Sequence, residues 1–345
     1  MVSPPGPYGA KLQEMGFQWV PVPMERRSLN PWRELRLIYW LRKFIAREQV
    51  DLVHGFTIKS AVYGSLAARL ARVPARVSAV AGMGYVFASN DIKAHVLRPV
   101  VRALLRIALG GRGARLILQN PDDVAMFAKA RLVSPDFVRL IPGSGVDCVR
   151  FRPSDPRNRS GRFRVLLAAR LLWDKGLAEF VAAARQLRED GREIDFLVAG
   201  DPDPGNPAAV PEAILQGWVS EGAVKWLGHV DDMAELFSSV DVMVLPTSYR
   251  EGLPKGLIEA GASGLPLITT DVPGCREVVT DGVDGLLVPV KDSRALAAAI
   301  ARLHDDPALC ARLGKAAREK ALAEFDEKIV IERTLAVYAE LVQHA

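Results

Sequence analysis

The sequence contains little cysteine, few aromatic residues and no long apolar run that is free of charge. Only 3 of its 345 residues are cysteine and 7% are aromatic. The cysteines lie far apart and show no metal-ligand spacing, so we expect neither a disulfide scaffold nor a zinc site, and a reducing cytoplasm is the expected compartment. No uncharged apolar stretch reaches the roughly 18 residues of a membrane span, and residues 1–7 lack the layout of a signal peptide. We therefore expect a protein that touches a bilayer at most.

Composition and charge indicate a two-domain globular protein. The chain is 49% hydrophobic and 25% charged, which is typical of a packed, ordered protein, and its length favours two domains. Residues 1–150 contain 22 Lys or Arg and 10 Asp or Glu, a net charge of +12, so the rest of the chain carries −7. Such asymmetry indicates a first half that meets something anionic, such as a membrane surface, nucleic acid or a phosphorylated substrate.

Short runs rich in Val, Ile and Leu, each followed by helical periodicity, predict buried parallel strands. The predicted strands are residues 50–54, 76–81, 116–120, 165–169, 194–200, 240–246 and 266–270. Their alternation with helices predicts an α/β fold with doubly wound sheets. Residues 151–164, with two Pro, one Gly and five Arg, read as a linker. We therefore expect a first domain over 1–150, a second over 165–325, and a C-terminal helix over 326–345 that packs back toward the first domain. Ligands of such domains bind beyond the carboxyl ends of the strands.

The segment after the strand at 240–246 is the most informative for chemistry. A Gly- and Pro-containing loop leads into a helix expected to start near Pro254, where Pro is tolerated because its missing N–H would have been unpaired. Free backbone N–H groups and a helix N-terminus suit an anion such as a diphosphate. Glu251 lies in the loop and Glu259 about one turn into the helix, so both carboxylates can face one cavity and accept hydrogen bonds from sugar hydroxyls. Taken alone, such a pair is also typical of solvated helix charges.

Together with residues 266–269, 273–277 and 281–289, this segment resembles the retaining nucleotide-sugar glycosyltransferases of family 4. The resemblance implies the GT-B fold, in which two Rossmann-like domains face a cleft. Residues 169–176 are similar to the family's Arg and Lys-Gly signature, so Arg170 and Lys175 would grip the donor diphosphate. By the same resemblance, Glu259 would bind the donor ribose and Glu251 would contact the transferred sugar. The backbone that would hold sugar hydroxyls or phosphate is that of Gly252, Leu253, Pro254 and Lys255.

The resemblance also implies a mechanism without a protein nucleophile. The acceptor hydroxyl attacks from the face that the diphosphate leaves, and a phosphate oxygen takes its proton. Arg170, Lys175 and the helix N-terminus would supply the positive charge, so we expect no metal and no cofactor; the nucleotide sugar, with uridine as the expected base, is a substrate. Asp201-Pro202-Asp203 matches the carboxylate pair that binds manganese in the other glycosyltransferase fold. Its Pro- and Gly-rich loop favours a turn instead.

Residues of the first domain are candidates for the acceptor side. His54 ends a predicted strand, Gly82 and Gly84 follow another, and Gly145 and Asp147 belong to a segment similar to the family's Gly-Val-Asp. A local structural role explains the His and the Gly-Val-Asp segment as well. Many relatives carry a His in the loop that contains Gly82 and Gly84; this chain has none there, so no catalytic His is carried over.

Two basic segments, residues 31–48 and 93–115, place cations among aromatic or aliphatic residues. Such helices can lie in a membrane interface, although an ordinary amphipathic helix explains each segment equally well. With the charge of the first half, we expect a peripheral protein on the cytoplasmic membrane that binds no nucleic acid. Within the family, the chain is similar to bacterial transferases acting on undecaprenyl-diphosphate-linked sugars, of the N-acetylgalactosaminyltransferase type. A lipid-linked or other glycan acceptor is therefore expected.

The start of the chain departs from the family pattern. The family opens with a strand, a Gly-containing loop and a helix, whereas this chain begins at a Pro-rich segment that aligns beyond them. We expect the first domain to lack that strand and helix. Two alternatives to a transferase stay open: a nucleotide-sugar 2-epimerase-like enzyme, and a truncated, inactive, membrane-associated relative that still binds a nucleotide.

Overall fold

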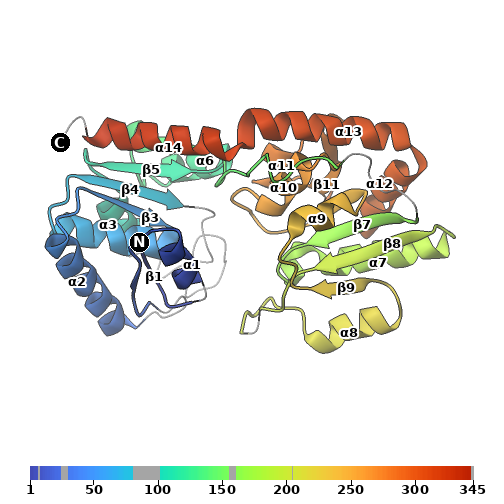
Figure 1. Cartoon of the computed structure of the whole chain (residues 1–345), viewed down its shortest axis with the longest axis horizontal. Coiled ribbons are helices and arrows are strands. Elements are labelled where there is room, and N and C mark those ends of the chain that lie inside the picture. Colours follow the sequence, from blue (N-terminus) through green and yellow to red (C-terminus); the bar gives the residue numbers. More distant parts are fainter. Residues whose placement is uncertain (7, 25–29, 81–101, 155–160, 204, 343–345) are drawn as a thin grey trace. The chain divides into compact units, whose positions relative to one another are not determined.

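The structure, a computed structural model, describes residues 1–6, 8–24, 30–80, 102–154, 161–203 and 205–342. Its contacts divide the chain into two compact units (Figure 1). Unit 1 comprises Met1–Leu118, Asp123–Arg139 and Leu335–Ala345, and unit 2 comprises Gln119–Asp122 and Leu140–Thr334.

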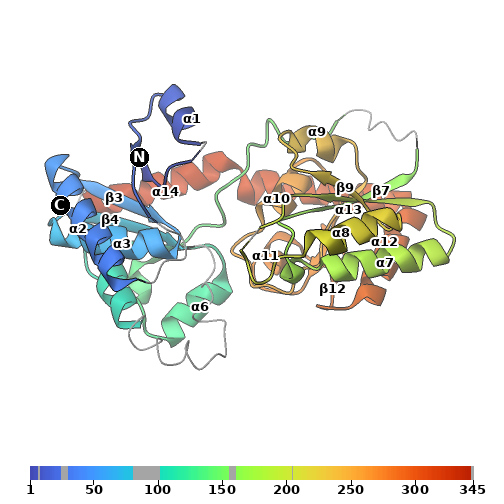
Figure 2. The ribbon, with the colours of Figure 1, turned by 90° about the horizontal axis from the view of Figure 1, so that it is seen from below.

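Unit 1 is built on a four-stranded sheet in the order β3-β4-β5-β6. Its strands are β3 (Leu52–Phe56), β4 (Ala75–Val80), β5 (Ala114–Leu118) and β6 (Val138–Leu140). The central strand β4 pairs in parallel with β3 and with β5. Helix α3 (Ile58–Leu70) packs on β3 and β4, and α2 (Pro31–Arg47) packs against α3 (Figure 2). A separate two-stranded parallel sheet and further helices complete the unit: β1 (Val2–Ser3), β2 (Val20–Pro21), α1 (Tyr8–Glu14), α6 (Pro121–Lys129) and the last turns of α14 (Glu327–Val342).

Unit 2 is built on a six-stranded sheet in the order β12-β11-β10-β7-β8-β9, and its neighbouring strands run parallel. The strands are β7 (Phe163–Ala168), β8 (Ile194–Ala199), β9 (Lys225–Gly228), β10 (Val242–Leu245), β11 (Leu267–Thr270) and β12 (Gly285–Val288). The chain builds from β7 to β9 toward one edge and then returns to build β10 to β12 toward the other. The direction of winding therefore reverses between β7 and β10, which is where doubly wound sheets bind ligands.

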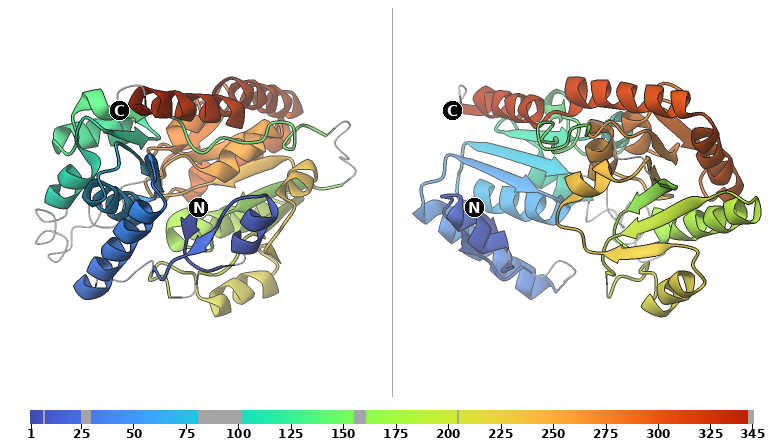
Figure 3. Two further views of the ribbon diagram at one scale, coloured as in Figure 1. Left: turned by 60° about the vertical axis from the view of Figure 1, so that its left-hand side comes forward. Right: turned by 45° about the vertical axis from the view of Figure 1, so that its right-hand side comes forward.

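Helices cover both faces of this sheet (Figure 3). One core contains Val165, Leu167 and residues of α7 and α12, and the other contains Leu166 and residues of α10 and α13. Successive residues of β7 thus point into opposite cores, as the two-residue period of a strand requires. The helices of unit 2 are α7 (Leu177–Glu189), α8 (Glu212–Ser220), α9 (Met233–Ser238), α10 (Lys255–Ala262), α11 (Cys275–Val278), α12 (Ser293–Asp305) and α13 (Pro307–Lys320). Of the helices in the described ranges, none combines the length and the apolar character that a bilayer crossing requires.

The seven strands predicted from apolar runs are confirmed, with ends shifted by a few residues. The helix expected near Pro254 begins at Lys255, and the helix expected from residue 326 begins at Glu327. Strands β9 and β12 were not predicted. They are the two edges of the six-stranded sheet, and each has only four residues. The β9 residues, Lys-Trp-Leu-Gly, are not a continuous apolar run, whereas those of β12, Gly-Leu-Leu-Val, are apolar and were missed as a strand.

The boundary between the units differs from the expected one. Residues 140–150, which we assigned to the first domain, belong to unit 2, and so do Gln119–Asp122. The reason is packing: Val146 and Cys148 are buried in the same core as Phe325, and the Val146 N–H donates to the Phe325 carbonyl at 2.9 Å. Residues 155–160 of the expected linker lie outside the described residues.

Gly176 lets the loop after β7 approach the end of β10 closely, and this contact gives a test of the fold. Its φ is +81°, and a Cβ there would lie 2.2 Å from the Pro246 carbonyl oxygen; Gly191 has a similar φ of +74° with nothing within 4 Å. We expect Gly191→Ala to lower the unfolding free energy by about 1 kcal/mol, the cost of a left-handed Ala, and Gly176→Ala to lower it by at least about 3 kcal/mol. Urea unfolding of both variants measures this, and equal losses would contradict the close contact.

Candidate functional site

The two segments that the sequence singled out lie side by side at the reversal point of unit 2. One follows β7 and contains Arg170 and Lys175, and the other follows β10 and contains Glu251. The segments are joined by backbone contacts: the Ser248 N–H donates to the Asp174 carbonyl at 2.9 Å. The sheet therefore brings together residues that are far apart in the sequence.

An ion pair between Lys175 and Glu251 is the centre of this region. The Lys175 ammonium donates to Glu251 Oε1, and both side chains are largely buried. The Thr247 hydroxyl, which is fully buried, lies 3.2 Å from the same carboxylate oxygen and 2.8 Å from the Asp174 carbonyl. Because each group has a partner of opposite charge, their attraction offsets part of the cost of burying them.

The loop that carries Glu251 is fixed by two amides that the sequence analysis did not single out. The Asn120 Nδ2 group lies 3.4 Å from the Glu251 carbonyl and 3.3 Å from that of Gly252 and donates to them. Gln119 Oε1 accepts from the Leu253 N–H at 3.1 Å. Asn120 is fully buried. The only signal in the sequence is a pair of amides directly after a predicted strand, and that pattern is too common to assign a role.

The same loop also packs on Gly274. The Glu251 N–H donates to the Pro273 carbonyl at 3.1 Å, and a Cβ on Gly274, whose φ is +90°, would lie 2.3 Å from the Gly252 carbonyl oxygen. Only glycine fits such a gap without displacing the backbone. Residues 273–277, which contributed to the family resemblance, therefore pack against the loop that carries Glu251.

The start of α10 offers backbone N–H groups to an anion. Pro254 has no N–H, and the Leu253 N–H is engaged by Gln119, so these two members of the expected backbone cradle donate nothing further. Within the described ranges, the N–H groups of Gly252, Lys255 and Gly256 show no acceptor. Unpaired N–H groups at a helix N-terminus attract negative charge. Of the expected backbone groups, only those of Gly252 and Lys255 have an N–H that an anion could use.

Glu259 and Arg170 stand apart from the central pair. Glu259, one turn into α10, lies 3.4 Å from the Lys255 ammonium, and burial raises the pKa of its carboxyl. Arg170 donates to Asp203 at 3.0 Å. The contacts seen in the structure do not join Glu259 to Glu251 or Arg170 to Lys175, although all four come from the same edge of the sheet.

The carboxylates of Asp201-Pro202-Asp203 do not converge. Asp201 lies 2.8 Å from the His229 ring, whereas Asp203 pairs with Arg170. Across the described ranges, His, Cys, Asp and Glu side chains do not gather in groups of three that would hold a metal ion. The loop has the turn structure that its Pro and Gly content predicts, with the Asn206 N–H donating to the Asp203 carbonyl at 3.0 Å.

The candidates for the acceptor side have local partners where they are described. In unit 1, His54 Nδ1 lies 2.6 Å from the Tyr338 hydroxyl, and burial lowers the pKa of its imidazole to about 4, so the ring is neutral. In unit 2, Asp147 accepts from the backbone N–H groups of the two residues at 149 and 150, which lowers the pKa of its carboxyl. Gly145 packs so closely on Glu327 that a Cβ would lie 2.5 Å from its Cα. Gly82 and Gly84 lie outside the described residues.

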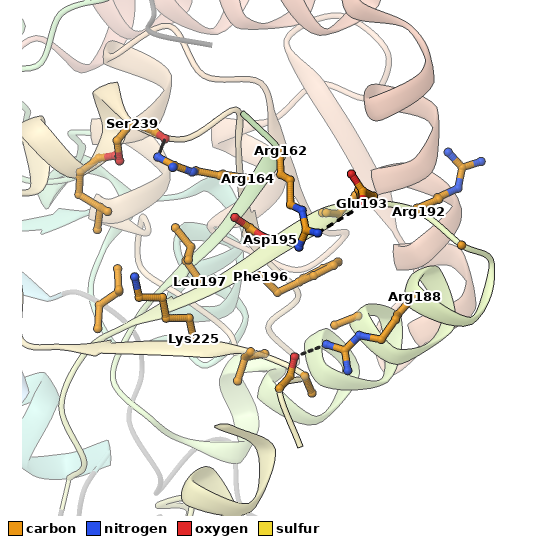
Figure 4. Close-up of a pocket in the computed structure, with 18 residues that line it drawn as sticks. Arg162, Arg164, Arg188, Arg192, Glu193, Asp195, Phe196, Leu197, Lys225 and Ser239 are labelled. Atoms are coloured by element: carbon orange, nitrogen blue, oxygen red, sulfur yellow. Dashed lines mark hydrogen bonds and ion pairs between the residues drawn. The ribbon is translucent and has the colours of Figure 1, made fainter. Parts of the chain in front are cut away.

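A large cavity of unit 2, of about 740 Å³, lies at the amino ends of β7, β8 and β9, whereas Lys175 and Glu251 follow the carboxyl ends of their strands (Figure 4). Three of its arginines have partners: Arg162 pairs with Glu193 at 3.2 Å, Arg164 donates to the Ser239 carbonyl after α9, and Arg188 donates to the Gly222 carbonyl after α8. Carbonyls at helix C-termini attract cations such as Arg164 and Arg188. The residues that the sequence singled out lie at the other ends of these strands, so the candidate site is the region of Lys175 and Glu251.

Two family models match the chain. One describes "Glycosyl transferases group 1" and matches residues 162–306, and the other describes "Glycosyl transferase 4-like" and matches residues 2–120. Both Lys175 and Glu251 lie within the first match, and together the two models cover most of the sequence.

Curated relatives match over nearly the whole chain. The N,N'-diacetylbacillosaminyl-diphospho-undecaprenol alpha-1,3-N-acetylgalactosaminyltransferase of Campylobacter jejuni is 29% identical, with 100% of this chain and 91% of that protein covered. The UDP-Gal:alpha-D-GlcNAc-diphosphoundecaprenol alpha-1,3-galactosyltransferase of Escherichia coli is 27% identical, with coverages of 93% and 83%.

Solved structures share the fold. A glycosyltransferase from Rickettsia africae superposes with a TM-score of 0.79 at 18% identity and covers 100% of this chain and 90% of its own. An Anabaena protein crystallised with UDP and glucose also gives 0.79, at 21% identity, with coverages of 97% and 89%.

The raised pKa of Glu259 makes a prediction for stability against pH. A carboxyl that is harder to ionise in the folded state favours folding below its unfolded pKa of about 4.3 and loses that contribution as pH rises through the folded value. Glu259→Gln should therefore be more stable than the unsubstituted protein at pH 7, and the difference should vanish below about pH 4. Thermal midpoints from pH 3.5 to 8 measure it.

Glu319→Gln is the matched control, because Glu319 also follows a Lys by four residues on a helix but is exposed. It should leave the stability profile unchanged. A Glu259→Gln variant that is less stable at pH 7 would contradict the burial argument.

Proposed function

The chain belongs to the family 4 glycosyltransferases and has their GT-B fold, and we propose that it moves a hexose or N-acetylhexosamine from a nucleoside diphosphate sugar to a glycan acceptor. The observation that carries the proposal is the Lys175–Glu251 pair, which lies where the winding of the six-stranded sheet of unit 2 reverses, between β7 and β10. A UDP-sugar is the proposed donor, which agrees with the UDP named for the Escherichia coli relative and the UDP bound by the Anabaena protein.

Positive charge at this edge suits a diphosphate leaving group. Lys175 and Arg170 carry cations on the loop after β7, and the start of α10 presents the N–H groups of Gly252, Lys255 and Gly256. As the bond between sugar and diphosphate breaks, negative charge grows on the diphosphate, and fixed donors and cations stabilise it. We propose that these groups do the electrostatic work, so that transfer needs no metal ion.

Glu251 and Glu259 have different proposed roles. Glu251 is held through Oε1 by Lys175 and Thr247, so its carboxylate is already engaged by neighbouring groups. We therefore propose retention through attack on the face that the diphosphate leaves, with a phosphate oxygen accepting the acceptor's proton and Glu251 binding a sugar hydroxyl. Glu259, buried beside Lys255, would accept hydrogen bonds from the ribose.

The proposed acceptor is a sugar linked to a lipid diphosphate, in the biosynthesis of a surface polysaccharide or glycan. Both bacterial relatives described above have undecaprenyl-diphosphate-linked substrates in their names. The protein would then work at the cytoplasmic face of a membrane.

Helix α2 supports the membrane part of the proposal. Trp32, Leu35 and Tyr39 are 81%, 58% and 52% exposed, and their spacing of three and four residues places them on one face. Cations surround them, and the Lys43 ammonium lies 4.9 Å from the centre of the Tyr39 ring. Exposed aromatic residues among cations bind the interface of an anionic bilayer.

Removing the Lys175 ammonium tests the transferase activity. With a panel of nucleotide sugars and a lipid-diphosphate-linked sugar acceptor, Lys175→Ala should lower kcat/KM by about 100- to 1,000-fold, because it removes a stabilising charge and leaves Glu251 unpaired. Lys315→Ala, which removes an exposed helix cation, is the control and should be unaffected. A product of inverted anomeric configuration would contradict the proposed mechanism, and epimerised donor without acceptor would favour the epimerase alternative.

Vesicle binding tests the membrane proposal. Replacing Trp32 and Tyr39 by Ala should lower cosedimentation with phosphatidylglycerol vesicles by about tenfold, since two interfacial aromatic anchors are lost. Replacing Ile331 and Leu335, two exposed apolar residues of α14, by Ala is the matched control, and this variant should bind as well as the unsubstituted protein. Equal binding of all three proteins, or no binding at all, would contradict a role for α2.

A further inference from the structure

Arg170 has a fixed carboxylate partner on a neighbouring loop. The loop of residues 201–210 follows β8, whose carboxyl end lies next to that of β7. Arg170 Nη1 donates to Asp203 Oδ2 at 3.0 Å, and the same oxygen accepts from Asn206 Nδ2 at 2.9 Å. Asp203 is thus held within its own loop while it holds Arg170.

The backbone of this loop is tied to the loop that carries Arg170. The Val210 N–H donates to the Leu171 carbonyl at 2.9 Å, and the Trp173 N–H donates to the Ala208 carbonyl at 2.8 Å. Leu172 and Ala209 form an antiparallel bridge. The backbones of the two loops are therefore joined, and Asp203 is kept near Arg170 by hydrogen bonds as well as by the ion pair.

The Arg170 side chain needs such a partner. It is 51% exposed, whereas Asp203 is only 21% exposed. A long cation at a surface loses rotamer entropy when a ligand fixes it, unless another group orients it first. A guanidinium held through Nη1 keeps its remaining N–H donors for an anion.

We propose that Asp203 is a positioning residue that orients Arg170 for the donor diphosphate. The proposal rests on the proposed function, because it assumes that Arg170 contacts the donor. It extends to Arg170 the arrangement seen at Lys175, where Glu251 holds the cation. The opposite reading is that Asp203 competes with the diphosphate for Arg170, and the two readings predict opposite changes in affinity.

The test measures UDP binding by calorimetry and donor KM. Asp203→Ala should weaken UDP binding and raise the donor KM by about tenfold, with a smaller change in kcat, because the cation must be ordered by the ligand. Asp203→Asn, which keeps an acceptor oxygen, should recover part of the loss. Asp201→Ala is the matched control: it removes the other carboxylate of the loop, which faces His229, and should leave UDP binding unchanged.

A double-mutant cycle separates positioning from loop folding. In an Arg170→Ala background, Asp203→Ala should cost nothing further. An equal cost in both backgrounds would overturn the proposal, because Asp203 would then act on the loop and not through Arg170. Tighter UDP binding by Asp203→Ala would also overturn it, in favour of competition.

A readout without donor distinguishes this proposal from the proposed function. Phenylglyoxal modifies arginine, and peptide mass spectrometry reports the rate at Arg170. The rate should be severalfold higher in Asp203→Ala than in the unsubstituted protein, and equal rates would overturn the ion pair. If the rates differ as expected but no UDP binds and no sugar is transferred, the proposed function fails, and with it the donor role of Asp203, while the ion pair itself stands.

Discussion

The site depends on one ion pair, between Lys175 and Glu251, that joins the ends of two neighbouring strands. The partners are 76 residues apart in the sequence, and they meet because β7 and β10 are adjacent in the sheet. Two charges with little solvent access are costly unless both are hydrogen-bonded, and Thr247 supplies a further contact to the carboxylate. Asn120 and Gly274 both pack on the loop that presents Glu251. Loss of either charge would leave the other buried and unpaired, so the pair constrains both loops.

Each cation after β7 is therefore paired before a donor arrives. Lys175 is held by Glu251 and Arg170 by Asp203, so the four side chains carry no net charge. A cation already held in place loses less freedom when it meets an anion, and fixed dipoles such as the N–H groups at the start of α10 need no reorganisation. A protein that bound the diphosphate with free, flexible cations would attract it more strongly at a distance but would have to order them during binding. The structure therefore has cations that are held in place before binding, at the expense of a net positive charge around them.

The sequence predicted the interior strands of this fold but not the contacts between loops. Runs such as residues 165–169 and 240–246 are apolar on both faces because helices cover both sides, whereas the four-residue edge strands β9 and β12 are too short to stand out, although β12 is itself apolar. Glu251 was singled out from its loop and Lys175 through the family resemblance, as separate residues. Their ion pair depends on strand order, which a sequence does not state. For Asp147 the motif left a cleft position and a structural turn equally open, and its carboxylate accepts from the backbone N–H groups of residues 149 and 150, as in a local turn.

The cations of the first half of the chain fall into two groups, those that bind other parts of unit 1 and those on the exposed face of α2. Within unit 1, Arg115 and Arg139 both pair with Glu340 of α14, and Arg69 and Arg106 donate to backbone carbonyls. These cations hold the unit together and are not available to an anionic partner. Helix α2 is different, because its cations lie beside aromatic rings, with Lys43 over the exposed Tyr39 and Arg47 over the half-buried Phe44. A net charge of +12 is thus weak evidence for a membrane, since part of it is internal. The exposed face of α2 is stronger evidence, because a helix that only packed on α3 would gain nothing from exposing a tryptophan and a tyrosine among cations.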